Sequence, residues 1–237
     1  MQSTSALYKS IVSKDSHWFE NMLVINGNNV NEDKIMSISR DRCGMPENKP
    51  SVGGAIASTM EFVVVKPMFE IPRQAEILVK IRAKSGTQVS EWLPAGTYFI
   101  DTRSYDETAN GIEFLKITAF DSMAKAEADY PDTSHAWPHL DKSVVAEIAT
   151  AMGVTVDPRT NSLMTAGHMI DIPIGSTMRE KLGNIASMYC GNFVVTAENK
   201  LLLVPLYGLD PDVNGRYLAD ESGNALVFGN EGWCILV

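Results

Sequence analysis

Hydrophobic and polar residues alternate with a period near two from Leu7 to about Phe120, and turn-forming residues separate the runs. This pattern is typical of successive half-buried strands. About seven such strands predict a barrel-like sheet, in which many strands pair with their sequence neighbours. The segment QAEILVKIRAK alternates most clearly and places on one face Ala75, Ile77, Val79, Ile81 and Ala83.

Turn residues and proline mark the ends of the predicted strands. The asparagine- and glycine-rich residues 26–29 predict a turn after HWFENMLVI, and the expected partner of that strand contains Ile35, Met36 and Ile38. Pro67 ends the strand in ASTMEFVVVKP, because proline has no amide to donate to a ladder. Further turns are predicted at Ser85-Gly86-Thr87 and Asn110-Gly111.

The pattern changes at Asp121, which is a suitable N-cap for a short helix in DSMAKAEADY. The polar, proline-containing segment PDTSHAWPH follows as a connector. The segment KSVVAEIATAMG then has helical spacing and ends at Gly153, and residues 154–156 are long enough for a brief strand. A small α/β unit is therefore predicted after the strands.

A second helix is predicted in GSTMREKLGNIASMYCG. Thr177 and Glu180 have the spacing of a capping box, and Gly191 is the expected left-handed stop. A hairpin with its turn at residues 198–200 follows. The apolar stripe of the helix consists of Met178, Leu182, Ile185 and Tyr189.

These elements predict an α+β, mainly β fold. We expect residues 1–125 to form the first part of a barrel-like β domain and residues 126–205 to form a small inserted α/β domain. Residues 206–237 again have strand and turn patterns. We expect them to return to the first domain, since a lone strand pair is marginally stable.

Composition narrows the function classes. The 237 residues are 45% hydrophobic and 21% charged, and the longest apolar runs are strand-sized, so we expect a soluble protein with no membrane segment. The first residues have no secretory leader pattern, which favours synthesis in a cytoplasm. The net charge of −9 is spread along the chain, with no basic stripe for nucleic acid. Cys43, Cys190 and Cys234 form neither a paired disulfide framework nor a CxxC metal clip.

Histidines offer the first candidate chemistry. His135 and His139 are four residues apart, but Pro138 disfavours the helix that would place both rings on one side. His17 and His168 are isolated in unrelated contexts. No metal-ligating residue is assigned.

Candidate nucleophiles lack the context that activates them. Cys190 is expected at the C-terminal end of its helix, where the helix dipole disfavours a thiolate. Ser176 is not in a GxSxG turn, and Pro173 interrupts the strand that would lead into it. No catalytic residue is assigned, and the chain is not expected to be an enzyme.

Acidic residues and glycines also lack a catalytic or nucleotide-binding pattern. Gly53-Gly54 and Gly175 are outside any phosphate-binding glycine motif, so no cofactor is expected. Nothing selects a carboxylate pair for glycoside hydrolysis, and a solvated face is expected for Asp101, Asp106, Glu107 and Glu113.

An ordered series of segments carries a family resemblance. IPRQAEILVKIRA, SEWLPAGTYFIDTR, LKITAFDSMAKAEADYP and IPIGSTMREKLGNIASMYCGNFVVTAENKLLLVPL occur in the order found in the baseplate hub or tail-tip hub proteins of bacteriophages and of prophages of Gram-positive bacteria. The chain resembles this family from Leu7 to Leu206, and ADESGNALVFGNEGWCILV is similar to the strand that closes the hub region.

The resemblance implies a virion structural protein at the phage tail tip. It implies a homotrimeric ring coaxial with the tail tube, contacts with tail-tube, distal tail and tape-measure proteins, and a lumen that the genome crosses without specific binding. An acidic chain suits such a lumen, because like charge prevents DNA from adhering. Many relatives continue into lytic or receptor-binding regions, and no such region is carried over here.

Two alternatives remain open. The chain could be the assembly half of a tail-associated cell-wall hydrolase or peptidase, or the hub of a phage-derived contractile injection particle. An enzyme should bring into one pocket two or more of His168, Asp171, Ser176 and Cys190.

Overall fold

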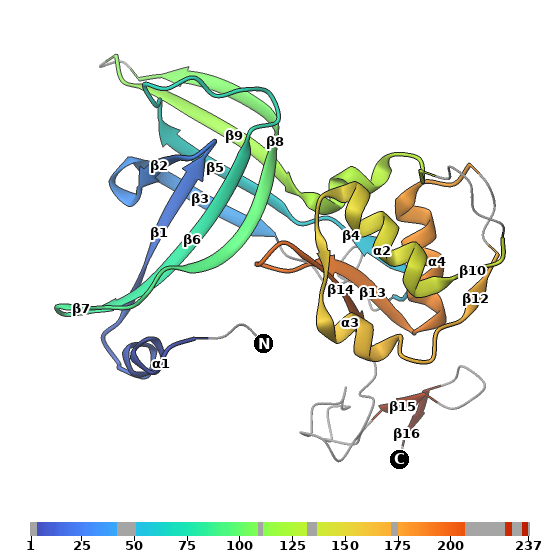
Figure 1. Ribbon diagram of the computed structural model, residues 1–237. Helices are drawn as coiled ribbons and strands as arrows, with labels where there is room; N and C mark the ends of the chain where they lie inside the picture. The colour runs from blue at the N-terminus through green and yellow to red at the C-terminus, as the bar shows by residue number, and fades with distance from the viewer. Residues whose placement is uncertain are drawn as a thin grey trace.

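The computed structural model describes residues 4–41, 51–108, 111–131, 137–171 and 175–206, together with the backbone of two short strands at 226–228 and 234–236. The described chain is mainly β. A large curled sheet lies beside a smaller α/β unit (Figure 1).

The large sheet is antiparallel throughout and curls into a half-barrel (Figure 1). The prediction of a barrel-like sheet is therefore confirmed. The short strand β7 (Gln88–Val89) extends a hairpin with β6. In spatial order the other strands are β2 (Asn28–Asn31), β1 (Trp18–Ile25), β6 (Glu76–Ser85), β8 (Leu93–Glu107), β9 (Glu113–Asp121), β5 (Thr59–Val65) and β3 (Ile35–Asp41).

One face of the curled sheet forms its hydrophobic core. The predicted inward face of β6 is confirmed, because Ile77, Val79 and Ala83 are buried and Ile81 packs against the core. Burial of each large side chain contributes roughly 1.5–3 kcal/mol. The core also includes, from the neighbouring strands, Leu23, Met60, Phe62, Tyr98, Leu115 and Ile117.

The predicted pairing of β1 with the segment containing Ile35, Met36 and Ile38 is wrong. Strand β1 pairs with β2 and β6, whereas β3 pairs with β5 at the other edge. Asn26 and Gly27 both have positive φ and form a two-residue turn, which joins β1 directly to β2. The 3-10 helix η1 (Glu32–Lys34) then leads the chain to β3.

The N-terminal segment is helical rather than extended, which corrects the expectation of strands from Leu7 onward. Helix α1 (Ala6–Val12) begins at Ser5, whose hydroxyl accepts a hydrogen bond from the amide of Tyr8. Ile11 is the buried residue of this helix. With only seven residues, α1 is too short for helical periodicity to be distinguished from alternation.

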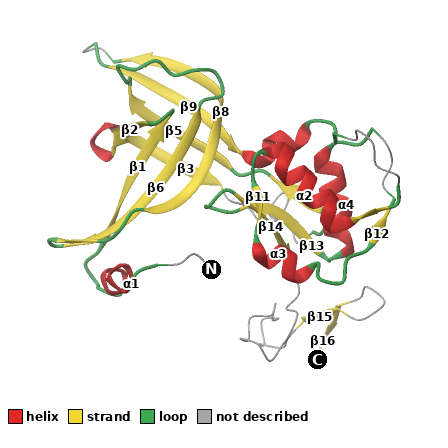
Figure 2. Ribbon diagram, viewed as in Figure 1, coloured by secondary structure: helices red, strands yellow, loops and turns green. Residues whose placement is uncertain are grey.

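The smaller unit contains a four-stranded sheet and three α-helices, of which α2 and α4 lie side by side (Figure 2). Strands β10 (His139–Leu140) and β12 (Met169–Ile170) form a separate pair, as do β15 (Leu226–Phe228) and β16 (Cys234–Leu236). The helices are α2 (Asp141–Met152), α3 (Pro158–Leu163) and α4 (Met178–Met188), and the sheet order is β11 (Thr155–Val156), β14 (Lys200–Pro205), β13 (Gly191–Val195) and β4 (Gly54–Ile56).

Strand β4 connects the two units in a way that the sequence analysis did not anticipate. It pairs in parallel with β13, although it precedes most of the large sheet in the chain. The division into domains at residues 125/126 stays a prediction. The expected return of residues 206–237 to the large sheet falls mostly outside the described residues.

The predicted cap and apolar stripe of α4 are confirmed. The Thr177 hydroxyl accepts from the Glu180 amide at 3.1 Å, and the Glu180 carboxylate accepts from the Thr177 amide at 2.9 Å. Met178, Leu182 and Ile185 are buried.

The predicted left-handed stop at Gly191 is wrong, because Cys190 has φ 46° and takes that conformation. Gly191 begins β13 instead. A β-carbon at Gly191 would lie 2.6 Å from the carbonyl oxygen of Val204, so this glycine serves close packing between β13 and β14.

The junction between the units is formed by the 3-10 helix η3 (Ser122–Glu127), which begins at Asp121 as predicted. The Asp121 carboxylate accepts hydrogen bonds from the amides of Ser58 and Met123, each at 3.0 Å. The Lys125 ammonium lies 3.8 Å from the centre of the Phe99 ring. None of the helices in the described part of the chain has the length and apolar character needed to cross a membrane.

Candidate functional site: assembly surfaces

The curled sheet has terminal strands at β2 and β3, and β3 and the far end of β8 offer main-chain groups that can pair with another chain. Strand β3 pairs only with β5 among the described residues. Strand β8 pairs with β6 up to Phe99, and from Thr102 to Glu107 it pairs only with β9 in the described part of the chain. Residues 101–107 are all exposed. Long open edges of this kind are assembly contacts or aggregation sites unless they are protected.

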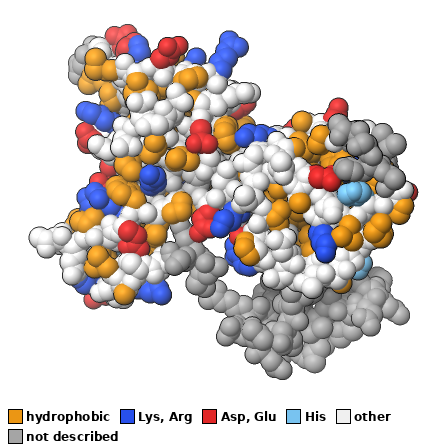
Figure 3. Space-filling model, in the orientation of Figure 1, with side chains coloured by type: hydrophobic (Ala, Val, Ile, Leu, Met, Phe, Trp, Pro, Cys, Tyr) orange, Lys and Arg blue, Asp and Glu red, His pale blue; other side chains and the backbone are white. Residues whose placement is uncertain are grey.

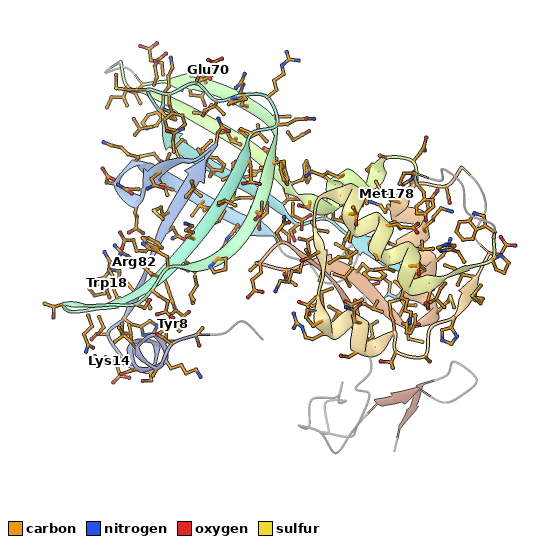
Figure 4. All side chains as sticks on the ribbon, in the orientation of Figure 1. Tyr8, Lys14, Trp18, Glu70, Arg82 and Met178 are labelled. Carbon is orange, nitrogen blue, oxygen red and sulfur yellow. The ribbon has the colours of Figure 1, made fainter. Side chains whose placement is uncertain are left out.

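Exposed apolar side chains gather at the end of the sheet that carries α1 and β7. Trp18 is 50% exposed and Phe19 is 39% exposed, in the first two positions of β1. Leu7 of α1 and Val89 of β7 are exposed as well. Figure 4 shows Tyr8, Lys14 and Trp18 close together at this end. We call the set of Leu7, Trp18, Phe19 and Val89 the lower apolar cluster; since Trp18 and Phe19 are consecutive on β1, they lie on opposite faces of the sheet at this end.

Helix α1 is tied to the hairpin that contains β7. The Ser5 amide and hydroxyl donate to the Glu91 carboxylate at 2.8 and 2.7 Å, and the Lys14 ammonium donates to the Gln88 side chain. The hydrogen bond from the Ser5 hydroxyl lowers the pKa of Glu91. These contacts hold the lower apolar cluster on a defined scaffold.

A charge cluster lies farther along β1 and β6, on the face that also carries Trp18. The Glu20 carboxylate accepts from Arg82 Nε at 2.6 Å and forms an ion pair with Lys84. The hydrogen bond from Arg82 lowers the pKa of Glu20. The Arg82 guanidinium also stacks 4.3 Å from the centre of the Trp92 ring. The cluster sets one carboxylate against two cations and therefore keeps one excess positive charge.

The other end of the sheet is more polar. Lys66 forms an ion pair with Glu113 at 2.7 Å, and its ammonium lies 5.4 Å from the centre of the Tyr105 ring. Arg103 donates to the carbonyl of Ile71 at 2.6 Å, which ties β8 to the loop between β5 and β6. Glu70, on the same loop, lies at this end in Figure 4.

Surface charges of both signs are interspersed on the face shown in Figure 3. The predicted solvated positions are confirmed, since all four carboxylates considered as catalytic pairs are exposed. They are Asp101, Asp106, Glu107 and Glu113. Among the described residues, no group of three or more His, Cys, Asp and Glu side chains is arranged to hold a metal ion.

The histidines lie apart from one another. His17 Nδ1 is 2.7 Å from the Lys14 carbonyl oxygen, whereas the His139 ring packs edge-on against Trp137. The His168 ring lies 5.7 Å from the Tyr189 ring. His135 is outside the described residues.

The four residues named as a test of catalysis occupy different surroundings. Ser176 lines a groove between β4 and α4, and the residues lining this groove do not include His168, Asp171 or Cys190. Cys190 is exposed just after the C-terminal end of α4. This placement gives no catalytic pairing of Ser176 with the other three in that groove.

The groove itself was missed by the sequence analysis, which considered Gly53-Gly54 only as a nucleotide loop. It has a volume of about 870 Å³ and is lined by residues 53–57 on one side and by α4 and Ser176 on the other. A β-carbon at Gly183 would lie 2.6 Å from the Gly53 carbonyl oxygen, so the helix and the strand segment are in direct backbone contact. Gly53 and Gly54, which lie outside any predicted element, and Gly183 in the predicted helix were the available signal.

Solved structures with the same fold are prophage tail proteins. A 43 kDa tail protein of prophage MuSo2 from Shewanella oneidensis aligns with a TM-score of 0.56 and 14% identity, covering 88% of this chain and 61% of that one. A tail protein from Neisseria meningitidis aligns with a TM-score of 0.52 and 13% identity, covering 87% and 58% of the two chains. The chain thus spans about three fifths of the length of these structures.

Sequence comparison adds no relative. No protein-family model matches the chain, and a search of curated proteins gives no match. The similarity to tail proteins is therefore a similarity of fold.

Proposed function

We propose that this chain is a structural component of a bacteriophage tail and acts as a hub. In this proposal it forms a ring, a homotrimer, at the distal end of the tail tube, and it has no catalytic role. The observation that carries the proposal is the fold shared with two prophage tail proteins over 87–88% of the chain. The Gram-positive origin in the sequence resemblance stays a prediction.

The geometry of the large sheet supports ring formation. A half-barrel with open edges at β3 and at residues 102–107 of β8 leaves main-chain donors and acceptors unpaired among the described strands. Neighbouring copies can satisfy these groups by continuing the sheet, and a head-to-tail contact that closes gives a ring. The lower apolar cluster adds side-chain surface for the same purpose.

The proposed partners follow from the position of a hub. The ring would contact the tail tube, distal tail proteins and the tape-measure protein, and the genome would leave through its lumen. With a net charge of −9 the chain is suited to a channel that DNA crosses without binding. The protein would be made in the host cytoplasm and would reside in the virion.

Mass photometry of the full chain over a range of concentrations tests the ring. We expect trimers to increase with concentration. Met36, 60% exposed on edge strand β3, should be sensitive, because a lysine there places charge on the proposed seam. Met36→Lys should therefore lower the trimer fraction at least severalfold.

Met169→Lys is the matched control, since Met169 is 62% exposed but lies on β12 in the smaller unit. It should leave the trimer fraction unchanged. A chain that stays monomeric at high concentration, and that forms no ring in electron micrographs of assembled tails, would contradict the proposal.

A further inference from the structure

The strand β4 has an open edge beside α4. It pairs with β13 and is the last strand of the four-stranded sheet among the described residues. The smaller unit therefore presents main-chain groups in the groove described above. This edge is distinct from the edges that we assign to the ring.

Hydrogen bonds at the ends of the neighbouring strands show which groups of β4 face the groove. Just outside the paired strands, Leu206 N–H donates to the Cys190 carbonyl and Thr196 N–H donates to the Lys200 carbonyl, so even-numbered residues of β13 face β14. Odd-numbered residues then face β4, in agreement with the 2.9 Å bond from Gly53 N–H to the Gly191 carbonyl.

This alternation orients Ala55 toward the groove. Phe193 lies in register with Ala55, and in a parallel ladder a residue bonds to the two neighbours of its partner, here Gly54 and Ile56. The N–H and C=O of Ala55 consequently point away from β13. An amide and a carbonyl side by side on a strand edge are complementary to the backbone of another polypeptide.

Small residues line this edge, and at Gly53 they let the backbone of α4 approach closely. The segment Gly53-Gly54-Ala55 carries little side-chain bulk, and α4 presents Gly183 and Ser187 to it. The volume of about 870 Å³ lies within the range of sites that enclose a ligand. The same lining also includes the larger side chains of Ile56, Arg179 and Glu180.

The groove lining carries one charge of each sign, Arg179 and Glu180. Arg179 forms an ion pair with Glu127 at 2.9 Å and donates to the Met123 carbonyl. The Glu180 carboxylate accepts from the Thr177 amide in the capping box. A nucleic acid or a highly charged segment gains nothing from such a lining, whereas an uncharged segment loses no solvation of charge.

Apolar surface at one end supplies an anchor. Val52 is 48% exposed immediately before Gly53, and Met188 is 50% exposed immediately after Ser187. Gly53 and Ser187 are close to each other, so the exposed residues Val52 and Met188 each adjoin in sequence a residue at this end of the groove.

We propose that the groove between β4 and α4 binds an extended, uncharged segment of a partner polypeptide, which adds to β4 as a fifth strand and places an apolar side chain against Val52 and Met188. This binding goes beyond the ring and does not depend on it.

The probe comes from a displayed library of random linear peptides of about ten residues. Peptides that bind the full chain are selected from this library. We expect enriched peptides to be uncharged, with an apolar residue at one end. Asn184, exposed on α4 in the groove lining, offers a blocking position. Asn184→Arg should lower the affinity of the chain for an enriched synthetic peptide about tenfold or more. The matched Asn184→Ala should keep that affinity within about twofold.

Amide hydrogen exchange supplies the decisive readout. The bound peptide should protect the amide of Ala55, which faces the groove, and leave the amide of Trp18 in the large sheet unchanged. Failure to enrich any peptide that protects Ala55, or enrichment of charged peptides, would overturn the proposal. Self-association of the full chain that Asn184→Arg abolishes would identify a second copy as the occupant and would also overturn it. Met36→Lys does not touch this groove, so failure here is distinguishable from failure of the ring.

Discussion

At the residue scale, Asp157 joins helix α3 to the sheet of the smaller unit. Its amide donates to the Leu201 carbonyl at 2.9 Å, and its buried carboxylate accepts from the Arg159 amide as the cap of α3. Arg159 Nε and Nη2 both donate to the same carboxylate at 2.9 Å. This bidentate hydrogen bond is the main reason that the pKa of Asp157 falls from 3.8 to about 2.

Asp157→Ala should lower the free energy of unfolding at pH 7 by about 1–2 kcal/mol, because it removes the cap and the ion pair. Arg159 is half-exposed, so solvent screening keeps the ion-pair share modest. A folded-state pKa below the unfolded one means that the stabilisation is complete above about pH 4 and is lost as the pH falls toward 2. Urea unfolding from pH 7 to pH 3 checks this, with Asp157→Asn as the variant that keeps the cap. A pH-independent difference between Asp157→Asn and the native chain would contradict it.

Cys190 and Gly191 test the corrected end of α4. Cys190→Gly should raise the free energy of unfolding by about 0.5 kcal/mol, since glycine adopts φ 46° more readily. Gly191→Ala should lower it by about 2 kcal/mol, because the new β-carbon would press on the Val204 carbonyl. Both are measured by urea unfolding, and Cys190→Ala should bring no gain. If Cys190→Gly lowered the free energy of unfolding by more than Gly191→Ala does, the left-handed position would belong to Gly191, as first predicted.

Residue-scale features were predictable where they depend on close sequence neighbours. Thr177 and Glu180 are three residues apart, and their capping box is present as predicted. The role of Gly191 depends on Val204, which is brought beside it only by the hairpin. The sequence therefore showed that a glycine is needed near the end of α4, but it did not show that close packing against Val204 is the reason.

At the element scale, the start of α4 rests on the two hydrogen bonds of its capping box. Thr177→Ala removes the hydroxyl that accepts from the Glu180 amide and should cost about 1 kcal/mol of unfolding free energy. Thr177→Ser keeps the hydroxyl and should cost only a few tenths of that. Thermal or urea unfolding distinguishes the two, and equal losses would show that the methyl packing of Thr177 matters instead.

The type of each element was easier to predict from the sequence than the strand with which it pairs. Alternation identified the buried face of β6 because side chains on a strand alternate regardless of its neighbours. The same alternation does not select a partner, and β3 was assigned to β1 although it pairs with β5. The neighbour of β1 is β2 because the turn at Asn26 and Gly27 joins these two strands, and η1 then leads the chain to β3.

At the scale of the whole molecule, the charge distribution predicts weak interaction with DNA. Acidic and basic side chains are interspersed, and the net charge is −9. Fluorescence anisotropy with a short labelled duplex should show binding no tighter than about 0.1 mM, even at low salt. Tight binding that weakens steeply with added salt would reveal a basic surface and would count against a neutral conduit.

The groove between β4 and α4 could not be predicted from the sequence. Its two sides are separated by more than a hundred residues, and local patterns carry no information on such distant contacts. The general architecture, a curled sheet followed by a small α/β unit, was predictable because it depends on the type and order of elements.

The pairing of β4 with β13 also determines the order in which parts of the chain can fold during synthesis. Gly54 bonds to the side chain of Asn192, 138 residues later. At ordinary bacterial and eukaryotic elongation rates of about 5–20 residues per second, β4 leaves the ribosome roughly 7–28 s before its partner strand does. During this interval the nascent chain can complete the large sheet while β4 is unpaired, so the four-stranded sheet closes after the large sheet.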